Sequence, residues 1–143
     1  MLMKDKVVII SGIGPGLGVE LALLAANEGA KAVVLAARTA SKLTDAAQQI
    51  AALGLGTKTL EVPTDIAKPE DCKNLVAKTV EAFGCVDALV NSAYIRGRFG
   101  SWEKWDFDDW RKTFDVNLFG SMTLAREAAK VMKDQPQRGA IVM

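Results

Sequence analysis

Apolar stretches alternate with amphipathic stretches along almost the whole chain. Five short apolar runs are typical of buried β-strands, at residues 6–11, 31–37, 57–62, 86–90 and 139–143. The first contains the uninterrupted run Val7-Val8-Ile9-Ile10, with no polar residue at alternate positions. Such continuous apolar character favours strands of a parallel sheet that is covered on both faces.

The segments between these runs have the spacing of helices, at residues 16–28, 41–53, 69–83 and 107–133. Ser41 is expected to cap the second helix, and Pro69 occupies the first helical position of the third. The fourth segment is the longest. Its apolar stripe keeps helical spacing throughout, at Trp110, Phe114, Leu118, Met122, Ala125, Ala129 and Met132.

Regular alternation of strand and helix predicts right-handed crossovers and an α/β fold with a doubly wound parallel sheet of Rossmann type. The 143 residues contain no repeat, low-complexity stretch or linker, so we predict one domain over residues 1–143. In such sheets, ligands bind beyond the carboxyl ends of the strands, where the chain order reverses.

The composition excludes several classes of function. A net charge of +1, from 18 basic and 17 acidic residues, predicts no nucleic-acid partner and no anionic membrane surface. The absence of histidine excludes Ser-His-Asp and Cys-His chemistry, and we expect no metal site. No apolar run approaches the roughly 20 residues that span a bilayer. The two cysteines lack metal-ligand spacing, and we expect them to be free thiols in a reducing cytoplasm.

The most informative segment is the turn at residues 11–18, Ser-Gly-Ile-Gly-Pro-Gly-Leu-Gly, which links the first strand to the first helix. Spaced glycines at a helix start let backbone N–H groups approach a phosphate closely. A kinase-type P-loop is excluded because Val19 and Glu20 follow Gly18, and the spacing G-x-G-x-x-G is also not matched. Taken alone, a tight turn without a ligand explains this segment equally well.

The end of the second strand bears on the choice of a dinucleotide. An acidic residue that holds the adenosine ribose is usual about 20 residues after the glycines. Here Ala37 takes that place and Arg38 follows. With no acid to repel a 2′-phosphate and a guanidinium beside it, NADP(H) is favoured as the cofactor, with NAD(H) as the alternative. Arg38 could instead stack on the adenine or face water.

The spacing [Ser/Thr]-G-x-x-x-G-x-G, matched by Ser11, Gly12, Gly16 and Gly18, resembles the short-chain dehydrogenase/reductase family. Further matches follow the third strand at Asp65, the fourth strand at Asn91 and Ala93, and the long helix at Asn117. Residues 91–94 read Asn-Ser-Ala-Tyr where the family usually has Asn-Asn-Ala-Gly, so Ser92 and Tyr94 depart from its pattern. The glycine turn departs too, because Pro15 stands where many NADP(H) enzymes have a second basic residue.

The resemblance implies an NAD(P)(H)-dependent oxidoreductase that transfers hydride between the nicotinamide and a carbonyl/alcohol substrate. It also implies a catalytic role for Asn117, whose side chain or carbonyl would hold a water in a proton relay; a polar contact in the core is the alternative. Asp65 would bond the adenine, or merely form a turn. The residues implied to bind the cofactor are Ser11, Gly12, Pro15, Gly16, Leu17, Gly18, Arg38, Asp65, Ile66, Asn91 and Ala93.

Part of the family's pattern has no match in this chain. The resemblance implies a serine after the fifth strand and a Y-x-x-x-K pair on the next helix, and the C-terminal part of the family fold is absent. The one tyrosine, Tyr94, is followed four residues later by Arg98 instead of lysine, so we interpret it as a pocket or packing residue. The chain alone is therefore expected to be inactive, and a non-catalytic dinucleotide-binding or regulatory module remains an alternative.

Two further expectations concern surfaces. The stretch 96–105, with Phe99, Trp102 and Trp105, either lines a substrate pocket or packs against the edge of the sheet. The family resemblance implies a homo-oligomer, assembled through the long helix at residues 107–133.

Overall fold

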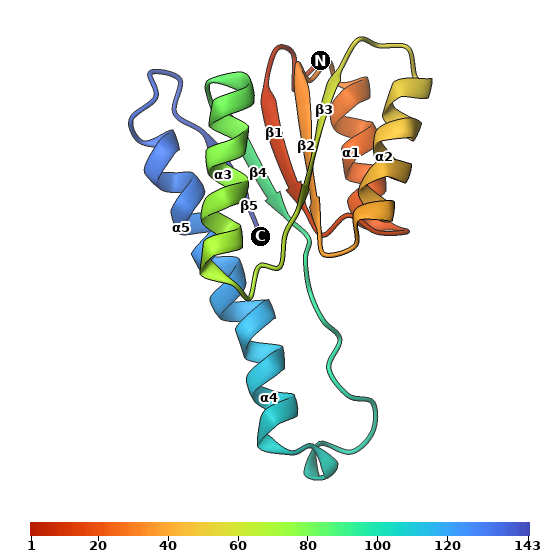
Figure 1. The fold of residues 1–143 in the computed structure, drawn as a ribbon, viewed down its shortest axis with the longest axis vertical. Helices are drawn as coiled ribbons and strands as arrows, with labels where there is room; N and C mark the ends of the chain where they lie inside the picture. Colours follow the sequence, from red (N-terminus) through yellow and green to blue (C-terminus); the bar gives the residue numbers. More distant parts are fainter.

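The computed structural model describes residues 1–143 and contains a five-stranded parallel sheet in the order β3-β2-β1-β4-β5 (Figure 1). Every neighbouring pair of strands is parallel. The strands are β1 (Val7–Ser11), β2 (Ala32–Ala37), β3 (Lys58–Pro63), β4 (Ala88–Asn91) and β5 (Ala140–Val142). The chain reverses its direction of winding between β1 and β4, which confirms the predicted doubly wound fold.

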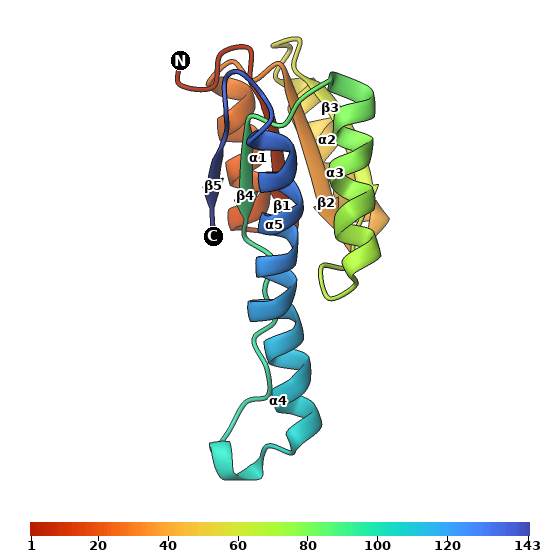
Figure 2. The same cartoon turned by 90° about the vertical axis from the view of Figure 1, so that its left-hand side faces the viewer.

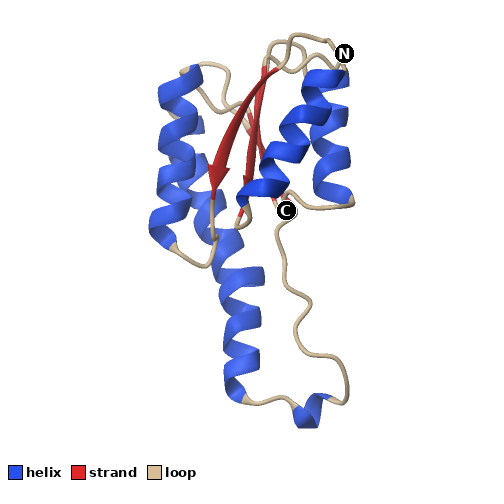
Figure 3. Cartoon of the chain, turned by 45° about the vertical axis from the view of Figure 1, so that its right-hand side comes forward, coloured by secondary structure: helices blue, strands red, loops and turns tan.

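Helices cover both faces of the sheet. Helices α1 (Leu17–Asn27) and α2 (Ala40–Ala52) lie on one face, and α3 (Pro69–Phe83) and α5 (Ser121–Met132) lie on the other (Figures 1 and 3). Helix α4 (Phe107–Phe114) and a π-helical turn (Asp115–Gly120) continue directly into α5. No helix is long and apolar enough to cross a membrane.

The core consists of two apolar layers, one on each side of the sheet. One joins alternate residues of β1 and β2 to the small and aliphatic residues of α1 and α2, such as Ala22, Leu43 and Ile50. The other joins the opposite faces of the strands to α3 and α5, through residues such as Leu75 and Leu124. All five residues of β1 are buried, as expected for the central strand of a covered parallel sheet.

Residues 92–120, which we call the arm, extend away from the sheet (Figure 2). The arm comprises a loop, a short 3₁₀ turn at Trp102–Lys104, α4 and the π-helical turn. Asp106 caps α4 by accepting a hydrogen bond of 2.8 Å from the backbone N–H of Asp109. None of residues 92–119 is buried.

The structure confirms every predicted strand and helix, with ends that differ by at most two residues. The predicted cap at Ser41 is wrong, because α2 begins at Ala40 and Thr39 is the residue before it. The long helix is helical as predicted, but it contains the π-helical turn. The N-terminal part of its apolar stripe does not face the core, since Trp110, Phe114, Leu118 and Met122 are 37%, 47%, 45% and 53% exposed.

Candidate functional site

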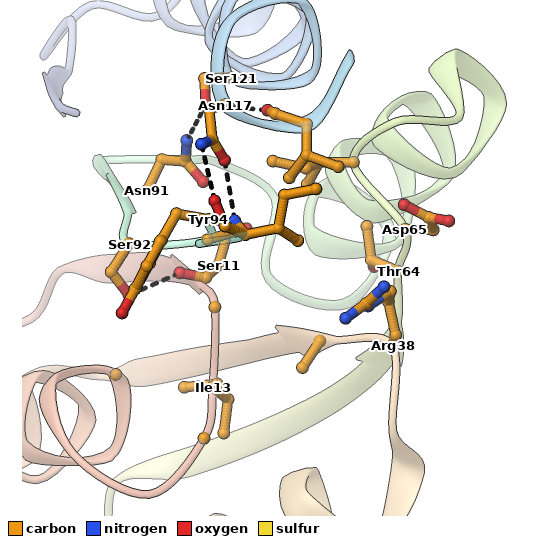
Figure 4. Close-up of a pocket in the computed structure, with 18 of the residues that line it drawn as sticks. Ser11, Ile13, Arg38, Thr64, Asp65, Asn91, Ser92, Tyr94, Asn117 and Ser121 are labelled. Carbon is orange, nitrogen blue, oxygen red and sulfur yellow. Dashed lines mark hydrogen bonds between the residues drawn. The ribbon is translucent and has the colours of Figure 1, made fainter. Parts of the chain in front are cut away.

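A cleft of about 700 Å³ opens at the carboxyl ends of the strands, where the sheet meets the arm. Its walls come from the glycine turn after β1, the ends of β2, β3 and β4, and the π-helical turn. In Figure 4, Arg38, Thr64 and Asp65 lie on one side of the cleft, and Asn91, Tyr94 and Asn117 lie on another. The cleft therefore lies at the point where doubly wound sheets bind ligands.

Close packing explains two glycines of the turn. A Cβ on Gly12 would collide with the backbone of Ala93, and a Cβ on Gly18 would collide with the carbonyl of Gly12. Gly16 has a φ of 112°, a conformation that other residues rarely adopt, and it immediately precedes α1. Gly14 differs from these, because a Cβ there would meet nothing within 4 Å.

The glycine turn offers free hydrogen-bond donors to the cleft. The backbone N–H groups of Gly12 and Ile13 donate to the carbonyl of Ala36. Those of Gly14, Leu17 and Gly18 donate to no group of the chain. Unbonded N–H groups at the start of a helix bind anionic oxygens, so the turn fits the pyrophosphate of a dinucleotide.

Two basic side chains line the cleft just after β2. Arg38 follows the strand directly, and Lys42 lies in the first turn of α2. Both are exposed, and neither forms an ion pair. No carboxylate lies in the connection between β2 and α2, so this end of the cleft is positively charged.

The end of β3 presents a short polar loop. The hydroxyl of Thr64 donates to the carbonyl of Val62 at 2.8 Å, and the Asp65 carboxylate accepts from the N–H of Ala67 at 3.1 Å through Oδ1. The second oxygen of Asp65 and the backbone N–H of Ile66 have no partner in the chain. The aspartate thus forms the turn that sequence reasoning weighed as the alternative, and still keeps one oxygen for a ligand.

Asn91 ends β4 and joins it to α5. Its side-chain amide donates to the Ser121 hydroxyl at 2.8 Å, while its Oδ1 is buried without a hydrogen-bond partner. A buried acceptor without a donor is costly, so this oxygen calls for a group that enters the cleft. The next residue, Ser92, donates to the carbonyl of Ser11 through both its backbone N–H and its hydroxyl, each at 2.9 Å.

Asn117 lies in the π-helical turn and holds the start of the arm. Its Oδ1 accepts from the N–H of Ile95 at 2.8 Å, and its Nδ2 donates to the carbonyl of the same residue at 2.9 Å (Figure 4). The side-chain amide is therefore occupied by the backbone. Gly120 allows this turn to approach the loop after β3, because a Cβ there would lie 2.7 Å from the Ile66 carbonyl oxygen.

Among the titrating groups, shifted pKa values occur outside the cleft. Burial, aided by Asp71, raises the pKa of the Cys72 thiol to about 11, so this side chain stays protonated and unreactive. Burial and Asp87 also raise the pKa of Cys85. A hydrogen bond from Lys130 lowers the pKa of Glu127. No group of three or more Cys, Asp or Glu side chains is placed to hold a metal ion.

The structure brings the residues predicted to bind the cofactor, together with Asn117, to one cleft. All of them line it except Gly16, which lies between the lining residues Pro15 and Leu17. Sequence reasoning missed Thr39, Lys42, Thr64 and Ser121, which also line it. Lys42 had a visible signal, since it is a second basic residue four positions after Arg38, whereas nothing in the sequence pairs Ser121 with Asn91.

The stretch 96–105 does not line this cleft and packs against α4. Arg96, Gly97 and Arg98 line a smaller hollow between the loop and α4, so a role in a substrate pocket stays a prediction. Arg98 approaches Asp109 at 3.4 Å, and the rings of Trp105 and Trp110 lie 5.1 Å apart. Phe99 and Trp102 are exposed. In the loop before this stretch, Ser92, Ala93, Tyr94 and Ile95 line the cleft, and Tyr94 is 67% exposed.

The fold and the cleft together define a Rossmann-type α/β protein with a ligand site at its switch point. Comparison with protein families specifies the class further. The family model described as short chain dehydrogenase matches residues 6–143, so the chain belongs to the short-chain dehydrogenase family.

Individual relatives agree with this assignment. An uncharacterized oxidoreductase of Staphylococcus aureus is 35% identical over 136 residues, which are 94% of this chain and 55% of that protein. The 11-beta-hydroxysteroid dehydrogenase A of Sesamum indicum is 37% identical over 141 residues, covering 99% of this chain and 39% of its own. The chain thus spans about half the length, or less, of these relatives.

Solved structures show the same fold. A short-chain type dehydrogenase/reductase from Mycobacterium marinum matches with a TM-score of 0.90 and 29% identity, over 97% of this chain and 55% of that one. An NAD⁺-bound xylitol dehydrogenase matches with a TM-score of 0.90 and 25% identity, over 99% and 53% of the two chains.

Proposed function

We propose that this chain binds NADP(H), with NAD(H) as the weaker ligand, as part of an oxidoreductase that acts on a carbonyl/alcohol pair. One observation carries the proposal: the unbonded N–H groups of the glycine turn and the unpaired Arg38 open onto the same cleft. Family membership and relatives named as oxidoreductases support the reaction class. The xylitol dehydrogenase bound to NAD⁺ supports a nicotinamide dinucleotide.

Each wall of the cleft has a proposed task. The N–H groups of Gly14, Leu17 and Gly18 would hold the pyrophosphate, and Arg38 would hold the adenosine ribose with its 2′-phosphate. The free oxygen of Asp65 and the N–H of Ile66 would bond the adenine. Asn91 would accept a hydrogen bond from a group beside the ribose, which satisfies its buried oxygen.

The arm would form the end of the cleft where the reaction takes place. When bound, the nicotinamide supplies or accepts a hydride, and the residues of the arm shape the space beside it. Because the Asn117 amide is occupied by Ile95, we assign the proposed water of the proton relay to the backbone carbonyl of Asn117. The serine, tyrosine and lysine implied by the family resemblance have no match here, so we expect no turnover from these 143 residues alone.

Titration of intrinsic or cofactor fluorescence with NADPH and NADH tests the cofactor assignment. We expect Arg38→Ala to weaken NADPH binding about tenfold and to leave NADH binding unchanged, since one charge-assisted bond is removed. Arg111→Ala, in an exposed part of the arm, is the matched control. An unchanged preference would refute the role of Arg38, and binding of neither dinucleotide to the wild type would refute the proposed function.

We further propose that the chain assembles into a homo-oligomer through the exposed stripe of α4 and the π-helical turn. Trp110 and Phe114 of α4 and Leu118 of the π-helical turn recur at helical spacing and are exposed, and Leu118 also borders the cleft. Light scattering after size exclusion should show a dimer or larger species, and Trp110→Ser with Phe114→Ser, outside the cleft, should produce monomers. A monomeric wild type at high concentration would contradict this. A cytoplasmic location stays a prediction from composition.

A further inference from the structure

The smaller hollow within the arm, which we call the arm hollow, has a volume of about 320 Å³. Its walls come from residues 95–98 of the loop and from Asp109, Lys112 and Thr113 of α4. Ile95 lines both the arm hollow and the main cleft, and the Asn117 amide holds its backbone through two hydrogen bonds. The arm hollow therefore adjoins the end of the cleft that we assign to the reaction.

Specific contacts fix the frame of the arm hollow. Gly97 has a φ of 74°, and a Cβ there would overlap the ring of Trp105, so the loop can approach this ring only with a glycine at this position. Arg98 donates to the Asp109 carboxylate at 3.4 Å, which ties the loop to α4. The Thr113 hydroxyl donates to the carbonyl of Asp109 at 2.9 Å. These side chains are therefore engaged in holding the walls together.

Two other cations of the arm hollow have no carboxylate partner. Arg96 lies 5.1 Å from the centre of the Phe99 ring, and neither Arg96 nor Lys112 forms an ion pair. Asp109, the one carboxylate that lines the arm hollow, is already paired with Arg98. Three cations and one carboxylate thus line the arm hollow, and this excess of positive charge favours an anion.

The loop adds hydrogen-bond donors to these charges. The backbone N–H groups of Arg96, Gly97 and Arg98 are consecutive, and they donate to no group of the chain. Unbonded N–H groups together with guanidinium and ammonium groups are the usual partners of carboxylate and phosphate oxygens. The chemistry of the arm hollow therefore fits an anionic group of this kind.

We infer that the arm hollow binds an anionic group of the substrate, so that the substrate is a carbonyl compound that carries a carboxylate or a phosphate. This inference rests on the proposed oxidoreductase function, and it names the substrate class. Arg96 and Lys112 would bind the anionic group, and Ile95 would lie between this group and the reacting carbonyl in the main cleft. Arg98 would act as a positioning residue, since Asp109 already neutralises its charge.

The test compares three methyl ketones, namely neutral 2-pentanone, 4-oxopentanoate and hydroxyacetone phosphate. They carry a methyl, a carboxylate and a phosphate group at the same number of bonds from the carbonyl carbon. Their dissociation constants are measured from the NMR shifts of the Gly97 and Thr113 amides, so the readout is binding and not turnover. The 143-residue chain is first saturated with NADPH, because the glycine turn would otherwise also bind the phosphate.

The wild type should bind at least one of the two anions about fivefold or more tightly than 2-pentanone, since charge-assisted bonds are added. The anion with the larger gain identifies the substrate as a carboxylate or a phosphate ester. Raising the NaCl concentration from about 0.05 M to about 0.5 M should reduce this preference, because the cations are exposed and salt screens them. The affinity for 2-pentanone should not fall.

Matched variants separate the arm hollow from the general charge of the arm. Arg96→Gln and Lys112→Gln should each weaken anion binding about threefold, and the double variant should abolish the preference over 2-pentanone. Lys112→Arg should retain it. Arg111→Gln is the control, because Arg111 is a neighbouring exposed cation of α4 that pairs with Asp108 and does not line the arm hollow. Circular dichroism of each variant checks that the fold is intact.

The outcomes distinguish this inference from the proposed function. If the wild type binds neither NADPH nor NADH, the proposed function fails, and the substrate assignment fails with it. If NADPH binds but both anions bind no more tightly than 2-pentanone, the proposed function stands and the inference is overturned. If the double variant of Arg96 and Lys112 keeps the preference, the anion binds elsewhere and the assignment of the arm hollow is overturned.

Discussion

The sheet with its covering helices and the arm form opposite walls of one cleft, yet they are held in different ways. The sheet lies between two continuous apolar layers, and every residue of β1 is buried. In the arm no residue from 92 to 119 is buried, and large apolar side chains such as Phe99, Phe107 and Phe119 lie in solvent. Burial of apolar area thus stabilises the first wall, and a few specific contacts hold the second.

This difference bears on how the cleft works. The wall proposed to hold the phosphates is rigid, since glycines without room for a Cβ lock the turn after β1 against neighbouring backbone. The wall formed by the arm depends on the Asn117 amide, the pair Arg98–Asp109 and the contact between the tilted rings of Trp105 and Trp110. Segments with few buried contacts open at low free-energy cost, so the arm is the part that can adapt to a substrate.

The largest effect should distinguish the two faces of the long helix. Leu124 is fully buried against the sheet, and Leu118 is 45% exposed only six residues earlier. Leu124→Ala should lower the free energy of unfolding by about 3 kcal/mol, because a cavity remains in the core. Leu118→Ala should change it by less than about 0.5 kcal/mol at concentrations where the chain is monomeric. Urea denaturation measures both, and equal losses would refute the division into a packed face and an open face.

The next effect tests the rigid wall of the cleft. Gly18→Ala should cost about 2 kcal/mol, because its Cβ would overlap the Gly12 carbonyl and the backbone must shift. Gly14→Ala is the matched control, since its Cβ meets open space, and it should change stability by less than about 0.5 kcal/mol. In Gly18→Ala, the melting temperature and the affinity for the dinucleotide should both fall. A Gly18→Ala protein as stable as the wild type would show that the turn is not locked.

A smaller effect is expected where the arm is attached. Asn117→Ala removes both hydrogen bonds to Ile95, at a cost of about 1 kcal/mol in local stability. Hydrogen exchange at the Ile95 amide should accelerate, while exchange in β1 stays slow. Asn117→Asp, which keeps the acceptor and loses the donor, should give an intermediate rate, and Asn74→Ala on α3 serves as the control. Unchanged exchange in Asn117→Ala would mean that other contacts hold the arm.

The smallest effect concerns a charge within the packed part. The hydrogen bond from Lys130, 2.7 Å long, lowers the pKa of Glu127. The stabilisation of the fold by this bond is therefore fully present above the pKa of Glu127 in the unfolded chain, and it is lost as pH falls through the pKa in the folded chain. Between about pH 5 and pH 3 the urea midpoint of the wild type should therefore drop more than that of Glu127→Gln. The corresponding difference in the loss of unfolding free energy between the two proteins should stay below about 1 kcal/mol. Parallel pH profiles would contradict this assignment.

Most of the fold and much of the cleft could be predicted from local patterns. Continuous apolar runs and Gly-rich or Pro-containing turns mark the strands and helices, because burial on both faces of a parallel sheet demands them. The cleft residues at strand ends could be predicted too, since parallel strands bring their carboxyl ends to one edge. The cap predicted at Ser41 was wrong because several polar residues there suit a helix start, and only the backbone conformation distinguishes them.

What the sequence alone determined is the order of strands and helices, the glycine turn and the absence of an acid after β2, since these depend on neighbours in the chain. The tertiary structure decided which face of the long helix packs on the sheet, with Leu124 and Met132 buried and Phe114 and Leu118 exposed. It also joined Asn117 to Ile95 and Asn91 to Ser121. These contacts join residues that are far apart in the sequence or on different elements, so they follow from how helices and strands pack and not from any local pattern.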